Sequence, residues 1–140
     1  MQHIHVSDVR DYIADRGSDD NPYLCDLAYT DEEIEKAMKT CAREYNSIPP
    51  LGVDCAHWYC LPLDTNIFLD GCAAALLRTE KLRRGRNDVE YSMAGASAAT
   101  EAVRLAHIEA EEKQMHARFK EAAMNYRLTI NIYNYFGPIV

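Results

Sequence analysis

The residues best suited to chemistry lie in one short segment, Cys55-Ala-His57-Trp-Tyr-Cys60. Thiolates and imidazoles are zinc ligands, so Cys55, His57 and Cys60 are candidates for part of a tetrahedral metal site. A structural zinc site usually has a second pair of ligands at a regular spacing, and no such pair follows here. We therefore favour small packed cysteines and a loop histidine, and expect the chain to need no metal or other cofactor.

Catalysis is the alternative use of the same residues. A cysteine nucleophile paired with His57 would need an oxyanion site or an activating helix start, and the surrounding residues mark neither. Further on, His107 and His116 fall on opposite sides of a predicted helix and cannot readily bind one ion, so they are expected at the surface. The carboxylates within 109–112 have basic neighbours and favour a solvated charged face. We expect no enzymatic activity.

Composition places the chain among globular proteins. Its 140 residues suit one domain, and no apolar run approaches the roughly 20 residues that a membrane helix needs. The net charge of −7 disfavours nonspecific binding to DNA or anionic lipid. We expect a cytosolic chain with reduced cysteines, because the first residues lack signal-peptide features. One basic cluster is expected to end a helix rather than to bind phosphate. It comprises Lys81, Arg83, Arg84 and Arg86.

The clearest element is the helix that begins after Thr30. Thr30 and Glu33 form a capping box, apolar residues recur every three or four positions, and Pro49 and Pro50 end the helix. Two further helices are predicted with weaker signals, and an irregular middle loop separates the helix that begins after Thr30 from the second of them. They cover Asp8 to Arg16, capped by Ser7, and a stretch from Asp64 or Thr65 to about Arg84, and the loop runs from Pro49 to Pro62.

The last helix is predicted to be unusually long. From Ala98 to Tyr126 the chain has no proline or glycine, which gives a helix of about 43 Å that should protrude from a small domain or be covered by other subunits. Glu112 interrupts its apolar seam of Leu105, Ile108, Met115, Phe119, Ala122 and Tyr126. The predicted core joins three helices through Ile34, Met38, Cys41, Phe68, Leu76, Leu105, Ile108 and Phe119.

The end of the chain changes period from helical to two, which predicts a β-strand. We expect two parts, a helical bundle over 1–127 and an extended interaction arm over 128–140 that pairs with another chain. A short alternation near residue 90 predicts an extended segment or an edge hairpin. The expected interface residues are Leu128, Ile130, Ile132, Tyr133, Tyr135, Phe136, Val89, Tyr91 and Met93. The predicted fold class is mainly α, a small helical bundle with one long C-terminal helix, an irregular middle loop and a C-terminal β-strand arm.

The order of these elements resembles the head-to-tail adaptor proteins of tailed bacteriophages, also called head-completion or neck proteins. The segments that carry the resemblance are VSDVRDYIADRGSDDNPYL, YTDEEIEKAMKTCAREYNSIPP and FLDGCAAALLRTEKLRRGRND, followed by the long helix and the strand-like end. They cover nearly the whole chain as a pattern rather than as a diagnostic motif. The segment from Cys55 to Cys60 departs from it.

The resemblance implies a structural virion protein. Such a subunit forms a homo-oligomeric ring, expected to be dodecameric, beneath the portal protein. The ring contacts the tail or other neck proteins and lines a passage through which DNA moves without specific binding. It would be found in the neck of the virion, and in the host cytoplasm during assembly, with no membrane partner. Three alternatives stay open: another neck or tail component, a small metal-binding or enzymatic cytosolic domain that uses Cys55, His57 and Cys60, and a cytosolic helical adaptor for a peptide.

Overall fold

Four helices make up most of the described chain, as the sequence predicts for a mainly α protein. The computed structural model describes residues 3–14, 28–49, 57–58, 63–87 and 95–136. Within these ranges it contains no strand. The helices are α1 (Val6–Tyr12), α2 (Asp31–Ser47), α3 (Thr65–Asn87) and α4 (Gly95–Phe136).

Helix α2 begins and ends where its sequence signals predict. The Glu33 amide donates to the Thr30 hydroxyl at 3.2 Å, and the Thr30 amide donates to the Glu33 carboxylate at 2.9 Å. This reciprocal capping box satisfies two amides that the first turn leaves without helical partners. Hydrogen bonding from the Thr30 backbone is the main cause that lowers the pKa of Glu33, and Arg83 adds to it.

The starts of α1 and α3 also depend on carboxylates. In α1 the cap is His5 and not the predicted Ser7, because Asp8 accepts from the His5 amide at 2.7 Å. Helix α1 ends at Tyr12, earlier than the predicted Arg16, which lies outside the described residues. In α3 the carboxylate of Asp64 accepts from the Asn66 amide at 2.9 Å, as predicted for a cap at this position.

Helix α4 continues through the segment that we predicted to be a strand. It is a single helix of 42 residues ending at Phe136, so the boundary placed after residue 127 falls inside it and residues 128–136 are helical. Extending a formed helix adds one hydrogen bond per residue, whereas a strand here has no described strand to pair with. The Thr129 hydroxyl donates to the Asn125 carbonyl at 2.9 Å, within the same helix. Residues 137–140 lie outside the described residues.

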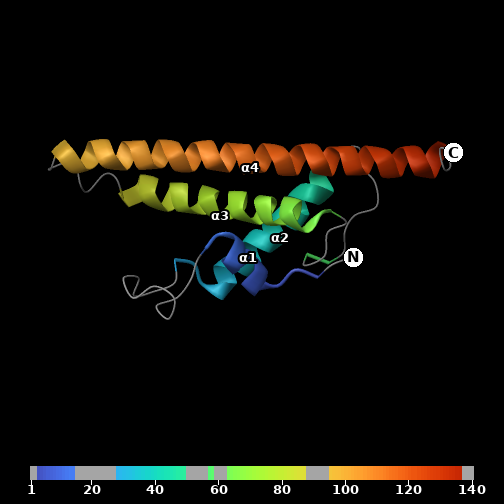
Figure 1. Ribbon diagram of the computed structural model, residues 1–140, viewed down its shortest axis with the longest axis horizontal. Helices are drawn as coiled ribbons and strands as arrows, with labels where there is room; N and C mark the ends of the chain where they lie inside the picture. The colour runs from blue at the N-terminus through green and yellow to red at the C-terminus, as the bar shows by residue number, and fades with distance from the viewer. Residues whose placement is uncertain (1–2, 15–27, 50–56, 59–62, 88–94, 137–140) are drawn as a thin grey trace.

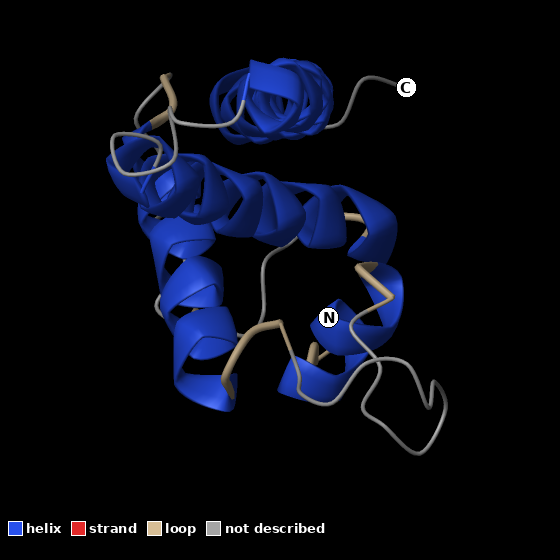
Figure 2. Cartoon of the chain, turned by 90° about the vertical axis from the view of Figure 1, so that its left-hand side faces the viewer, coloured by secondary structure: helices blue, strands red, loops and turns tan. Residues whose placement is uncertain are grey.

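Helix α3 packs against α4 on one side and against α1 and α2 on the other (Figure 1). Helices α3 and α4 run side by side in opposite directions, and α4 extends beyond the start of α3 at its C-terminal end. Viewed along α4, all other described helices lie on one side of it (Figure 2). At about 63 Å, α4 is much longer than the layer beneath it can cover.

The core lies where α2, α3 and α4 meet. Its largest buried side chains are Tyr45, Phe68, Phe119, Ile34 and Met38. Of the predicted core residues, only Leu105 and Ile108 are half-buried rather than buried, since α4 is covered on one side only.

Gly71 of α3 allows the three helices to come this close. A Cβ added to Gly71 would lie 2.5 Å from Cys41 Sγ and 2.7 Å from Phe119 Cδ2, which is closer than non-bonded atoms can approach. Glycine is thus required there by the lack of space and not by a special backbone conformation.

Candidate interaction surface

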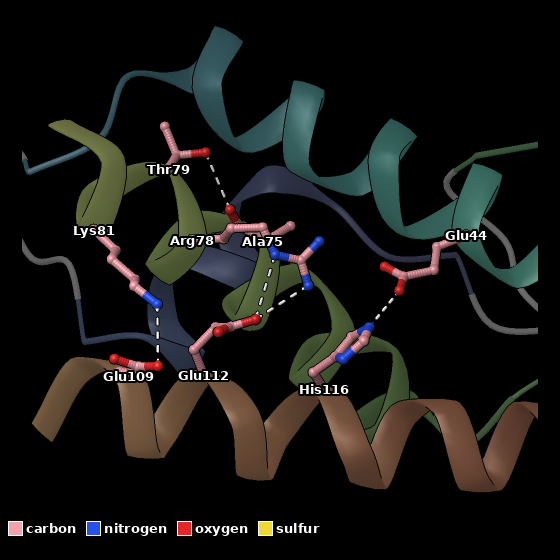
Figure 3. A network of polar contacts seen from close by, with 8 residues as sticks. All are labelled: Glu44, Ala75, Arg78, Thr79, Lys81, Glu109, Glu112 and His116. Atoms are coloured by element: carbon pink, nitrogen blue, oxygen red, sulfur yellow. Dashed lines mark hydrogen bonds and ion pairs between the residues drawn. The ribbon is translucent and has the colours of Figure 1, made fainter. Parts of the chain in front are cut away.

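The inward side of α4 is held by polar pairs as well as by the core (Figure 3). Glu112 is buried, and its Oε1 accepts from Nη2 of Arg78 at 3.1 Å and from Nε at 3.3 Å. Glu112 is thus the polar residue that interrupted the predicted apolar seam, and α3 supplies the cation that compensates it. One turn earlier, Glu109 lies 3.3 Å from Lys81 of α3. A hydrogen bond from Lys113 is the main cause that lowers the pKa of Glu109, and Lys81 adds to it.

A second set of contacts ties α4 to α1 and α2. Asp70, a buried residue of α3, accepts from the Tyr12 hydroxyl at 2.6 Å and from the Arg118 guanidinium at 3.2 Å. Burial and the bond to Asp70 raise the pKa of Tyr12 to about 12. His116, which we expected at the surface, is half-buried and pairs with Glu44 of α2 (Figure 3). Side chains with acid–base potential on this side are therefore used to join helices.

Near the C-terminal end of the part of α4 that packs on other helices, a buried arginine contacts α2. Arg127 donates from Nη1 to the Tyr45 carbonyl at 3.0 Å, and its guanidinium carbon lies 5.2 Å from the centre of the Tyr45 ring. Cation–ring contacts of this kind add to the hydrogen bond. The next residues, from Leu128 onward, extend beyond this contact.

The outward side of α4 carries a stripe that we call the outer seam. Its members follow one another at spacings of three or four residues, which keeps a stripe on one side of a helix. Every member is exposed. The outer seam consists of Val103, Ala106, Ala110, Gln114, Ala117, Glu121, Met124, Leu128 and Ile132.

Large apolar side chains in the outer seam are accessible to a considerable degree. Val103 is 71% exposed, Met124 and Leu128 are 41% exposed, and Ile132 is 43% exposed. Single exposed apolar residues are common, whereas a row of them along one side of a helix, here interrupted by Gln114 and Glu121, is typical of a surface that binds another protein. The outer seam is therefore the candidate interaction surface of this chain.

The structure changes the grouping of the predicted interface residues. Leu128 and Ile132 lie in the outer seam, but Ile130, two residues from each, is half-buried on another side of the helix. Tyr133 is 58% exposed. Tyr135 and Phe136 belong to α4, but their side chains are outside the description. Val89, Tyr91 and Met93 lie outside the described residues, so their part in an interface stays a prediction.

A signal for the outer seam is present in the sequence. Val103, Ala110, Ala117 and Met124 are spaced seven residues apart, as in a helix with a second contact surface. The stronger apolar seam that faces the core concealed this weaker stripe, in which alanine predominates.

The candidate metal ligands are only partly described. His57 is exposed, and Cys55 and Cys60 lie outside the described residues. Among the residues that the structure describes, no group of three or more histidine, cysteine, aspartate or glutamate side chains could hold a metal ion. Cys41 and Cys72 are buried free thiols, and burial raises the pKa of Cys41 well above its usual value.

The basic cluster at the end of α3 is engaged in ion pairs. Besides the Lys81 pair with Glu109, Arg83 pairs with Glu33 of α2, and Arg84 pairs with Glu80 at 2.7 Å. The side chain of Arg86 is outside the description. The first two pairs join α3 to α4 and to α2, and the third lies within α3, in agreement with the structural interpretation of the cluster.

One open cleft of about 400 Å³ lies elsewhere, between the N-terminal residues, α2 and Trp58. Its walls are mostly apolar, and Lys39 Nζ lies 4.8 Å from the Trp58 ring. The lining residues are His3, Ile4, His5, Val6, Glu35, Met38 and Trp58. Sequence reasoning did not find this cleft.

Comparison with protein-family models, curated proteins and solved structures gives no match to this chain. Within the described residues, no helix is both long and apolar enough to cross a membrane.

Proposed function

We propose that this chain is a structural subunit of the neck of a tailed bacteriophage, a head-to-tail adaptor that forms a homo-oligomeric ring between portal and tail. The observation that carries the proposal is the uncovered outward side of α4 with its exposed outer seam. A helix of about 63 Å on a domain this small gives more surface than one subunit can bury. The sequence resemblance supplies the particular setting.

The electrostatics of the chain support a passage for DNA rather than a binding site for it. The net charge is −7, and the described cations of the basic cluster are paired with carboxylates. Binding to the phosphate backbone requires cations that can displace counterions. A ring of such subunits would therefore let DNA move through without holding it.

The proposed partners are further copies of the chain in a ring expected to be dodecameric, the portal protein, and tail or other neck proteins. We propose no catalytic step, because the polar groups on the inward side of α4 are used in contacts between helices. The site of action would be the virion neck, after assembly in the host cytoplasm.

Electron microscopy of the chain, produced together with the portal protein from the same genome, tests this proposal. We expect rings stacked on the portal. Leu128→Ser should prevent stacking, because it places a hydroxyl in the apolar outer seam. Leu82→Ser is the matched control, since Leu82 is an exposed leucine of α3, 66% accessible and outside the outer seam. Absence of portal-bound rings with the unaltered chain would contradict the adaptor proposal.

A further inference from the structure

The outer seam is one continuous stripe from Val103 to Ile132, about 44 Å long. The mean spacing of its members is close to the 3.6 residues of a helical turn, so the stripe runs nearly parallel to the axis of α4. No other described helix lies on this side of α4 (Figure 2). A second straight helix could contact the stripe along its whole length.

Side-chain size is distributed unevenly along the stripe. The N-terminal half contains the small residues Ala106, Ala110 and Ala117, whereas the C-terminal half contains Met124, Leu128 and Ile132. Closely packed helices place large side chains against small ones. Two copies of the stripe in parallel would set Met124, Leu128 and Ile132 against themselves. An antiparallel pair sets Met124 and Leu128 against alanines at both ends and leaves only Val103 and Ile132 as neighbouring large side chains.

Charge favours the same orientation. When Ala117 lies at the two-fold axis of an antiparallel pair, Glu121 of one copy faces Lys113 of the other, and the contact occurs twice by symmetry. In a parallel pair Glu121 would face Glu121, and Lys113 would face Lys113, so like charges would repel. Both side chains are exposed, and Lys113, which pairs with Glu109 of its own helix at 2.9 Å, would have to be shared between Glu109 and the other copy's Glu121.

We propose that free copies of this chain form a two-fold dimer in which the outer seams of two α4 helices pack antiparallel. Ala110 of each copy then faces Met124 of the other, and Ala106 faces Leu128. Val103, the large residue at the N-terminal end, comes near Ile132 at the end of the pair. The occupant of the exposed stripe is thus a second copy of the same stripe.

This dimer goes beyond the adaptor proposal and does not depend on it. A two-fold pair closes on itself and cannot extend into a ring. If the ring uses the outer seam, the dimer is a storage form that keeps the apolar surface covered and must open before assembly. The dimer is measured on the isolated chain and the ring with the portal, so failure of one proposal is distinguishable from failure of the other.

Charge exchange combined with analytical ultracentrifugation tests the dimer. Glu121→Lys and Lys113→Glu each create two like-charge contacts, and each should raise the dimer dissociation constant about tenfold or more. The double variant Glu121→Lys with Lys113→Glu should restore dimerisation. Glu32→Lys, the same charge change at an exposed position of α2, is the control and should leave the dissociation constant unchanged.

Carbodiimide cross-linking of a mixture of isotopically heavy and light protein determines the orientation. We expect mixed heavy–light peptides that join Glu121 to Lys113. A chain that stays monomeric at all concentrations would overturn the proposal. So would a dimer that the single charge changes leave intact, a double variant that stays dissociated, or cross-links that require parallel helices.

Discussion

The two sides of α4 belong to the same helix but follow different rules. The inward side contains a polar residue, Glu112, where apolar residues are expected, and the protein compensates it with Arg78. The outward side contains apolar residues, such as Leu128, where polar ones are expected, and nothing in the described chain covers them. The buried carboxylate finds its partner within the same subunit. The exposed apolar residues find none in the described chain, which is why we propose that another subunit covers them.

The largest effect should come from the inward side. Phe119→Ala removes a fully buried ring from the junction of three helices and should lower the free energy of unfolding by about 3 to 5 kcal/mol. Val103→Ala, an apolar truncation on the outward side of the same helix, should change it by less than about 0.5 kcal/mol. Urea denaturation measures both. Equal losses would show that the two sides do not differ in burial.

A smaller effect should follow from removing the compensating cation. Arg78→Met leaves the Glu112 carboxylate without its described cationic partner in a site where its side chain is only 11% exposed, and should cost about 1 to 3 kcal/mol. The double variant Arg78→Met with Glu112→Leu should recover part of the loss. Arg104→Met, at an exposed position of α4, is the control for loss of an arginine. If the double variant recovers no stability, Arg78 stabilises the fold through the packing of its side chain and not through its charge.

These contrasts also show what the sequence could reveal. Helix α2 was predicted in full because nearby residues such as Thr30, Glu33 and Pro49 determine where it begins and ends, and its apolar spacing determines which side is buried. The segment 128–136 was predicted as a strand because β-branched residues alternate there, but the long helix that was predicted to end near Tyr126 continues through it. The role of Glu112 depends on Arg78, 34 residues away, and no local pattern connects the two. The outer seam could be recognised only after the core-facing side was known.

The contact of Tyr12 with Asp70 should be visible at alkaline pH. The pKa of Tyr12 is about 12 in the folded chain and about 10 when unfolded, so the unfolded state loses this proton first. The contribution of Tyr12 to stability should therefore be fully present below pH 10 and be lost as pH rises from about 10 to about 12. In Tyr12→Phe that part of the decline should disappear, as measured by the difference between the two unfolding curves across this range. Parallel curves would show that burial and the bond to Asp70 do not raise the pKa of Tyr12.

The smallest effect on stability is expected at the outward side. Leu128→Ser and Ile132→Ser should each change the free energy of unfolding of the monomer by less than about 0.5 kcal/mol, because both residues lie at the exposed surface and outside the core. Both should nevertheless weaken association, as measured by sedimentation at rising concentration. A large loss of monomer stability at either position would place it in the core and remove the contrast between the two sides.

Gly71 restricts the order in which substitutions can accumulate in this sequence during evolution. Any replacement adds a carbon atom where Cys41 and the Phe119 ring already stand, so a first change at position 71 is harmful unless one of those neighbours has become smaller beforehand. Descendants of this chain should therefore lose the glycine only after a change at position 41 or 119, and the order of those events would record how three helices came to share one point of contact.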